Sequence, residues 1–145
     1  MKGDNSMYKR ILVAVDGSEN SKRAAEQASK IAVSSPGVHV EVLYVTDFDK
    51  SRKDVPPKIE DENLHVDNKN ILGPIKGAFE KNRIDYELIT KKGDPGSTIV
   101  SFANRGGFDL VIIGSRGLNS FQEMMIGSVS LKVARRVKAP VMIIK

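Results

Sequence analysis

Residues 111–130 read VIIGSRGLNSFQEMMIGSVS, and this stretch decides the fold that the sequence predicts. It begins as a short apolar run typical of a buried strand and ends in a segment with the periodicity of an amphipathic helix. Three glycines, Gly114, Gly117 and Gly127, lie between the two. A strand followed by a helix is the repeating unit of parallel α/β sheets. The connection is longer than the usual ~2–6 residues, which indicates that it serves a ligand.

The chain before and after this stretch alternates between strand-like and helix-like patterns. Short runs rich in Val, Ile and Leu predict strands at residues 9–15, 39–45, 84–90, 108–113 and 141–144. Apolar residues at helical spacing predict helices over residues 19–34, from about 58 to 82, after Pro95, and from Ser128 to Ala139. The apolar face of the last helix is expected to consist of Val129, Val133, Ala134 and Val137. Gly73-Pro74 interrupts the second helix, which either kinks or restarts there.

These elements predict an α/β fold with a doubly wound five-stranded parallel sheet and four helices. The expected strand order is 3-2-1-4-5. A chain of 145 residues suits one domain, placed at residues 8–145 after a flexible N-terminal lead of residues 1–7.

The composition excludes several classes of site. The absence of cysteine rules out disulfides, thiolate metal sites and a cysteine nucleophile. His39 and His65 lie far apart in different contexts, so a histidine-based metal cluster is not expected. A net charge of +5, with acidic residues interspersed, permits attraction to phosphates without requiring nucleic acid. No leader and no apolar run of roughly 20 residues occurs, so a soluble, cytoplasmic protein without membrane contact is expected.

The ends of the first and fourth predicted strands should meet, because the strand order reverses between them and ligands bind at such points. Asp16 and Gly114 follow these two strands directly. Gly114 and Gly117 could take positive φ values and let backbone N–H groups approach an anion. The connection and Asp16 would then face one crevice.

The start of the last helix would complete a phosphate site. Gly127 lets the chain enter the helix tightly, and Ser128 and Ser130 offer hydroxyls beside the free N–H groups of the first turn. Arg116 could add a positive charge. The alternative is that the glycines form a turn, that Ser128 only caps the helix, and that Asp16 with its neighbours forms a turn and cap. The P-loop, the dinucleotide-binding glycine motif and the nucleophile elbow are all absent.

The spacing Gly114-x-x-Gly117, nine residues, then Gly127-Ser128 resembles the ATP-binding signature of the universal stress protein family. The segments ILVAVDGSENS, LYVTD, GDP, DLVIIGSRG and APVMIIK agree with that family, and the resemblance spans roughly residues 8 to 145. It implies a Rossmann-like fold of the adenine nucleotide hydrolase type. It also implies bound ATP, with Mg²⁺ on its phosphates, and a homodimer built on the C-terminal strand at residues 140–145.

The resemblance implies a role for each matching position. Asp16 would contact the ribose or the phosphate-bound Mg²⁺, with the backbone of Val15 beside it, and Val45 would meet adenine through its main chain. Ile113 would line the site. The residues expected around ribose and phosphates are Gly114, Gly117, Gly127, Ser128, Val129 and Ser130. The family pattern does not fix position 116, so the contact of Arg116 is expected from its charge alone.

Binding is favoured over catalysis, because the sequence assigns neither a further base nor an arginine finger for hydrolysis. The chain is therefore expected to be a stress-response sensor or regulatory module, with slow Mg²⁺-dependent ATP hydrolysis as the alternative. A flavodoxin-like electron carrier would need its phosphate loop after the first strand, where only DGSENS stands. A nucleic-acid-binding module is permitted by the charge, but aromatic residues make up only 6% of the chain.

Overall fold

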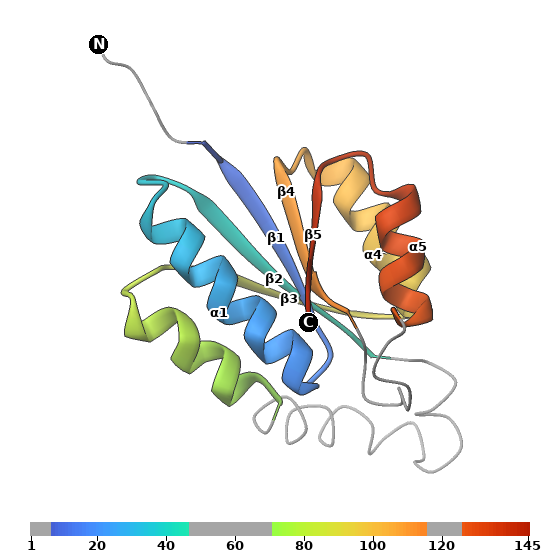
Figure 1. The fold of residues 1–145 in the computed structure, drawn as a ribbon, viewed down its shortest axis with the longest axis horizontal. Helices are drawn as coiled ribbons and strands as arrows, with labels where there is room; N and C mark the ends of the chain where they lie inside the picture. The colour runs from blue at the N-terminus through green and yellow to red at the C-terminus, as the bar shows by residue number, and fades with distance from the viewer. Residues whose placement is uncertain (1–6, 47–70, 116–125) are drawn as a thin grey trace.

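The computed structural model describes residues 7–46, 71–115 and 126–145, and these build one five-stranded parallel sheet. The strands lie in the order β3-β2-β1-β4-β5 (Figure 1). They are β1 (Arg10–Val15), β2 (His39–Thr46), β3 (Glu87–Lys92), β4 (Leu110–Gly114) and β5 (Val141–Ile144). The predicted α/β class and the order 3-2-1-4-5 are confirmed.

Helices cover both faces of the sheet, as a doubly wound fold requires. On one face lie α1 (Glu19–Val33) and the helix of residues 71–81, and on the other lie α4 (Pro95–Gly106) and α5 (Ser128–Arg136) (Figure 1). The described residues thus contain the four predicted helices. None of these helices has the length and apolar character that a membrane crossing requires.

The central strands are apolar on both faces because both faces are covered. Ile11 and Val13 of β1 pack towards α1, whereas Leu12 and Ala14 pack towards α4 and α5. Ile11, Leu12 and Val13 have no exposed surface, and each buried side chain of this size contributes about 1.5–3 kcal/mol. This continuous burial holds β1 and β4 side by side at the point where the strand order reverses.

The edge strand β3 overlaps the predicted strand at residues 84–90 but begins and ends later. Tyr86, placed in the strand by its alternation, precedes it and packs against Phe79 in a tilted ring pair with centroids 4.9 Å apart. Lys91 and Lys92, predicted as a turn, are strand residues that pair with Val45 and Thr46. The ladder with β2 therefore continues past the apolar residues that marked the strand in the sequence.

One further boundary and one assignment to an apolar face differ from the prediction. Phe108 is buried but lies before β4, because Gly107 ends α4 with a φ of 66° and Phe108 then stacks on Phe102 at 5.9 Å. Ala134 was assigned to the apolar face of α5 but is exposed, since the buried side of that helix carries Ser130 and Val133.

The prediction of a kink or restart in the second helix is only partly covered by the structure. Gly73 and Pro74 are helical within residues 71–81. The preceding part of the predicted helix, most of the loop from residue 46 to 58, and residues 1–6 of the N-terminal lead lie outside the described residues.

Candidate functional site

The candidate site lies at the carboxyl ends of β1 and β4. These strands are neighbours, with Ala14 paired to Ile113, so Asp16 and Ser115 follow them at the same edge of the sheet. The α5 helix also begins at this edge, because the N–H of Gly127 donates to the carbonyl of Ser115 over 2.7 Å. Segments about a hundred residues apart in sequence therefore meet, as the predicted topology requires.

Gly114 is needed for a reason other than the predicted one. The described glycines with positive φ are Gly17, Gly37, Gly93 and Gly107, so Gly114 does not use the left-handed region. A Cβ at Gly114 would instead lie 2.8 Å from the carbonyl carbon of Asn20 and 3.0 Å from the backbone nitrogen of Ser21. The first turn of α1 packs directly on this glycine.

The start of α5 has no side-chain cap among the described residues. Gly127 is the N-cap residue, in extended conformation at φ −65° and ψ 159°, and glycine has no side chain to accept a hydrogen bond. The backbone N–H groups at the start of the helix are therefore not satisfied by a capping side chain, and no acidic residue lies in the first turn. Such an end attracts anions. The alternative that Ser128 caps the helix is wrong, since Ser128 is its first helical residue.

Ser128 and Ser130 differ in what they can offer to a ligand. Ser128 is exposed. Ser130 is buried, and its hydroxyl donates to the carbonyl of Gly114, joining α5 to the end of β4. The Ser130 hydroxyl proton thus has a structural partner, whereas the Ser128 hydroxyl lies at the surface.

Asp16 takes part in the turn that starts α1. Its Oδ1 accepts from the N–H of Ser18 over 2.9 Å, and Ser18 in turn caps the helix by accepting from the N–H of Ser21 over 3.1 Å. This is the turn and cap that the sequence allowed as an alternative. The half-exposed carboxylate still has a second oxygen for a ligand or cation, so the two roles are compatible.

The strands place three further predicted residues near their carboxyl ends, and all three are buried. Val15, Val45 and Ile113 are buried, with 5%, 8% and 6% of their surface exposed. The Val45 side chain packs in the core against α4 and α5, which leaves its main chain as the part that could meet a ligand. Arg116 and Gly117 lie outside the described residues.

A buried polar network beside Gly114 was not predicted. Asn20 Nδ2 donates to Ser115 Oγ over 2.8 Å, and both residues are 6% exposed. Arg23 donates to Asn20 Oδ1 and, through Nε, to the carbonyl of Lys145 over 2.8 Å. The network ties α1 to the ends of β4 and β5. The only sequence signal is that Asn20 and Ser115 each stand in one of the two polar segments that follow the central strands.

The comparisons with known proteins agree on one family. Its sequence model, described as the universal stress protein family, matches residues 7–145. Universal stress protein YxiE of Bacillus subtilis is 32% identical over 148 residues, which cover 96% of this chain and 100% of YxiE.

Solved structures show the same fold. Protein MJ0577 of Methanocaldococcus jannaschii superposes with a TM-score of 0.81 at 29% identity, covering 96% of each chain. The crystal structure of a universal stress protein in complex with cAMP gives a TM-score of 0.68 at 27% identity, covering 95% of this chain and 97% of the other.

Proposed function

Because the chain belongs to the universal stress protein family, we propose that it binds ATP at the carboxyl edge of β1 and β4 and acts as a stress-response sensor or regulatory protein. The observation that carries this proposal is the uncapped start of α5, positioned at the end of β4 by the Gly127–Ser115 hydrogen bond. A related protein of the same fold binds cAMP, another adenine nucleotide, which supports the proposal.

The described residues fit an adenosine phosphate. The N–H groups in the first turn of α5 and the exposed Ser128 hydroxyl would hold phosphate oxygens. Asp16 would hold the ribose or, with phosphate oxygens, a Mg²⁺ ion, since this cation prefers oxygen ligands. The main chain of Val45 would meet adenine. The backbone of Gly114 would border the phosphates at the end of β4, and Arg116 and Gly117 would belong to the same phosphate-binding connection.

The proposed role is to hold ATP and not to cleave it rapidly. Rapid hydrolysis needs a group that orients water and cations that stabilise the transferred phosphoryl group. In the described part of the site, Asp16 is the acidic side chain that directly follows β1, and its Oδ1 already accepts from Ser18. The nearby Arg23 guanidinium already donates to Asn20 and to Lys145. Slow Mg²⁺-dependent hydrolysis is the second candidate, and the Asp16 carboxylate is the observation that favours it.

The proposal is tested by placing a negative charge in the first turn of α5. Ser128→Asp should weaken ATP binding by about tenfold or more, because the carboxylate repels phosphate where the helix end attracts it. A negative charge near the positive end of the helix dipole also stabilises the helix, so the melting temperature should not fall. Ser101→Asp, at an exposed position of α4, is the charge-matched control. Calorimetry on nucleotide-free protein measures the affinity of each variant for ATP in the presence of Mg²⁺. Equal affinities in the two variants, or no binding in the unaltered protein, would refute the site.

A further inference from the structure

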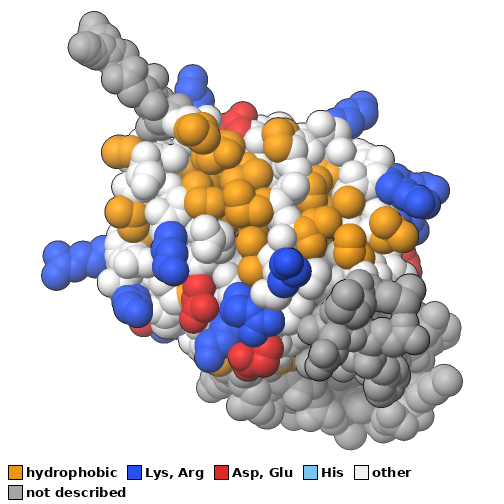
Figure 2. Space-filling view, viewed as in Figure 1, with side chains coloured by type: hydrophobic (Ala, Val, Ile, Leu, Met, Phe, Trp, Pro, Cys, Tyr) orange, Lys and Arg blue, Asp and Glu red, His pale blue; other side chains and the backbone are white. Residues whose placement is uncertain are grey.

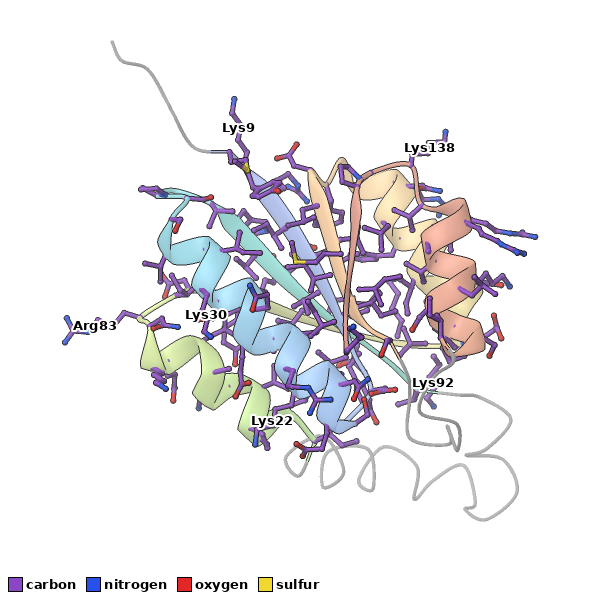
Figure 3. All side chains as sticks on the ribbon, in the orientation of Figure 1. Lys9, Lys22, Lys30, Arg83, Lys92 and Lys138 are labelled. Atoms are coloured by element: carbon purple, nitrogen blue, oxygen red, sulfur yellow. The ribbon has the colours of Figure 1, made fainter. Side chains whose placement is uncertain are left out.

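A group of side chains of the types that bind metal ions lies at the amino ends of the strands, opposite the candidate nucleotide site. His39 Nε2 is 2.9 Å from Glu41 Oε2 and 3.6 Å from Glu87 Oε1, and one ligand atom from each of the three residues lies within 4.8 Å of the other two. His39 is the first residue of β2 and Glu87 the first of β3, so the group stands at the amino ends of the strands. Lys9 and Lys92, labelled in Figure 3, mark the amino end of β1 and the carboxyl end of β3.

The backbone brings these three side chains together. His39 and Glu41 are two residues apart on one strand and therefore project from the same face of the sheet. Glu41 pairs directly with Glu87 in the parallel register. Two like charges directly opposite each other on neighbouring strands destabilise a sheet, and Arg10 offsets part of this repulsion by contacting Glu41 at 2.8 Å. The register thus creates a position that favours a bound cation.

We propose that His39, Glu41 and Glu87 form a binding site for a divalent transition-metal ion, with Zn²⁺ as the ion best suited. An imidazole with two carboxylates is a ligand set that Zn²⁺ accepts. Ligand atoms bound ~2.0–2.2 Å from Zn²⁺, at angles of ~90–110°, lie ~2.8–3.6 Å from one another. Both distances from His39 fall in that range. A histidine-based metal cluster was not expected from the sequence, because His39 and His65 are far apart; the structure instead brings two carboxylates to His39.

The surroundings of the three residues resemble those of a metal site. The Glu41 side chain is only 9% exposed, and Arg10 Nη2 donates to its Oε2 over 2.8 Å. The Arg10 guanidinium is itself held 4.9 Å from the centre of the Phe108 ring. Metal-ligating carboxylates are commonly oriented by such outer hydrogen bonds. His39 and Glu87, with side chains 45% and 62% exposed, leave the outer side open for an ion to enter.

The competing explanation is an ion-pair cluster, in which His39 only bridges the two carboxylates. Both explanations predict contacts among the three residues, but only the metal site predicts a stoichiometric response to Zn²⁺. The group lies at the amino ends of the strands and the proposed nucleotide site at their carboxyl ends. Zn²⁺ binding measured on nucleotide-free protein therefore tests the metal site independently of the proposed nucleotide site.

The test is titration of the tag-free, metal-free full chain with Zn²⁺ by calorimetry, together with the melting temperature. The unaltered protein should bind one equivalent with a micromolar Kd and melt at a higher temperature. His39→Ala and Glu87→Gln should each weaken binding by about tenfold or more, and both change exposed side chains, so folding should persist. His65→Ala, which removes the other histidine of the chain, should bind normally. No binding at 100 µM Zn²⁺, or equal affinity in His39→Ala, would overturn the proposal.

Discussion

At the residue scale, Gly114 shows how a position can serve a ligand site and the fold together. The glycine stands at the end of a buried strand, and its carbonyl accepts from Ser130 while the first turn of α1 lies against its Cα. A side chain would push α1 away from β4, because the nearest atoms are backbone atoms of Asn20 and Ser21 and the Cβ of Asn20, none of which can rotate aside. The spacing of the glycines is a signal in the sequence, but the contact with α1 follows from tertiary packing.

Gly114→Ala should therefore destabilise the protein by about 1–3 kcal/mol, the usual cost of forcing extra atoms into a packed interior. Gly77→Ala is the matched control: a Cβ at this helical position meets nothing within 4 Å, so the change should be neutral or stabilise by up to about 1 kcal/mol. Urea unfolding measures both free energies. Equal effects would mean that the close approach of α1 to Gly114 does not contribute to stability.

At the element scale, the strands that are buried on both faces are the ones whose positions the sequence predicts best. β1 and β4 were predictable because strands covered on both faces require apolar side chains throughout. The ends of β3 were predicted too early because an edge strand is held mainly by its backbone hydrogen bonds with β2. These bonds extend to Lys91 and Lys92, whose side chains are not apolar and so do not indicate a strand. In the candidate site, the glycine spacing and Asp16 were visible as local motifs. The Asn20–Ser115 bond was not, because the two residues are 95 positions apart and only the fold brings them together.

The start of α4 provides a pH-dependent prediction. Asp94 caps the helix, and hydrogen bonds from the N–H and hydroxyl of Ser97 lower the pKa of its carboxyl, with Lys132 of α5 contributing at 3.6 Å. When the pKa of a carboxyl is lower in the folded state, its ionised form stabilises the protein at pH values above the pKa of the unfolded state. This contribution is lost as the pH falls through the pKa of the folded state. The contribution is therefore complete at neutral pH and declines in acid.

Asp94→Asn keeps the capping oxygen but removes the charge. The variant should be less stable than the unaltered protein at pH 7, and the difference in the free energy of unfolding should shrink steadily as the pH falls below 4. Urea titrations of both proteins across this range measure the difference. A gap that stays constant with pH would show that the Asp94 charge does not contribute to folding stability.

At the scale of the whole molecule, the two edges of the sheet differ in what covers them. β5 is an edge strand whose four residues are all only half-buried, with Met142 and Ile144 facing one core cluster and Val141 and Ile143 the other. Figure 2 shows hydrophobic side chains gathered over the face on which β5 lies. β3, at the opposite edge, carries charged side chains at both ends. An apolar edge invites pairing with another strand, so we propose that two copies of the chain associate through β5.

The backbone of β5 shows how to test this assembly. The carbonyls of Pro140 and Ile144 accept from Val111 of β4 and from Ser115 just after it, so by alternation the N–H of Ile143 points away from β4, towards a second copy. Ile143→Pro removes that outward donor and leaves the ladder with β4 intact, as proline is tolerated at sheet edges. Light scattering should give twice 15.9 kDa for the unaltered protein and one chain mass for the variant.

Thr90→Pro is the matched control on the other edge. The N–H of Gly93 donates to the carbonyl of Thr46, and the alternation from there directs the N–H of Thr90 away from β2. The control loses an outward donor in the same way but should remain a dimer, because β3 is not part of the proposed interface. Dissociation of both variants would point to a general loss of structure, and a monomeric unaltered protein at micromolar concentration would exclude the β5 dimer. Dissociation of Ile143→Pro alone would place the interface at β5, because only that variant alters the shared edge.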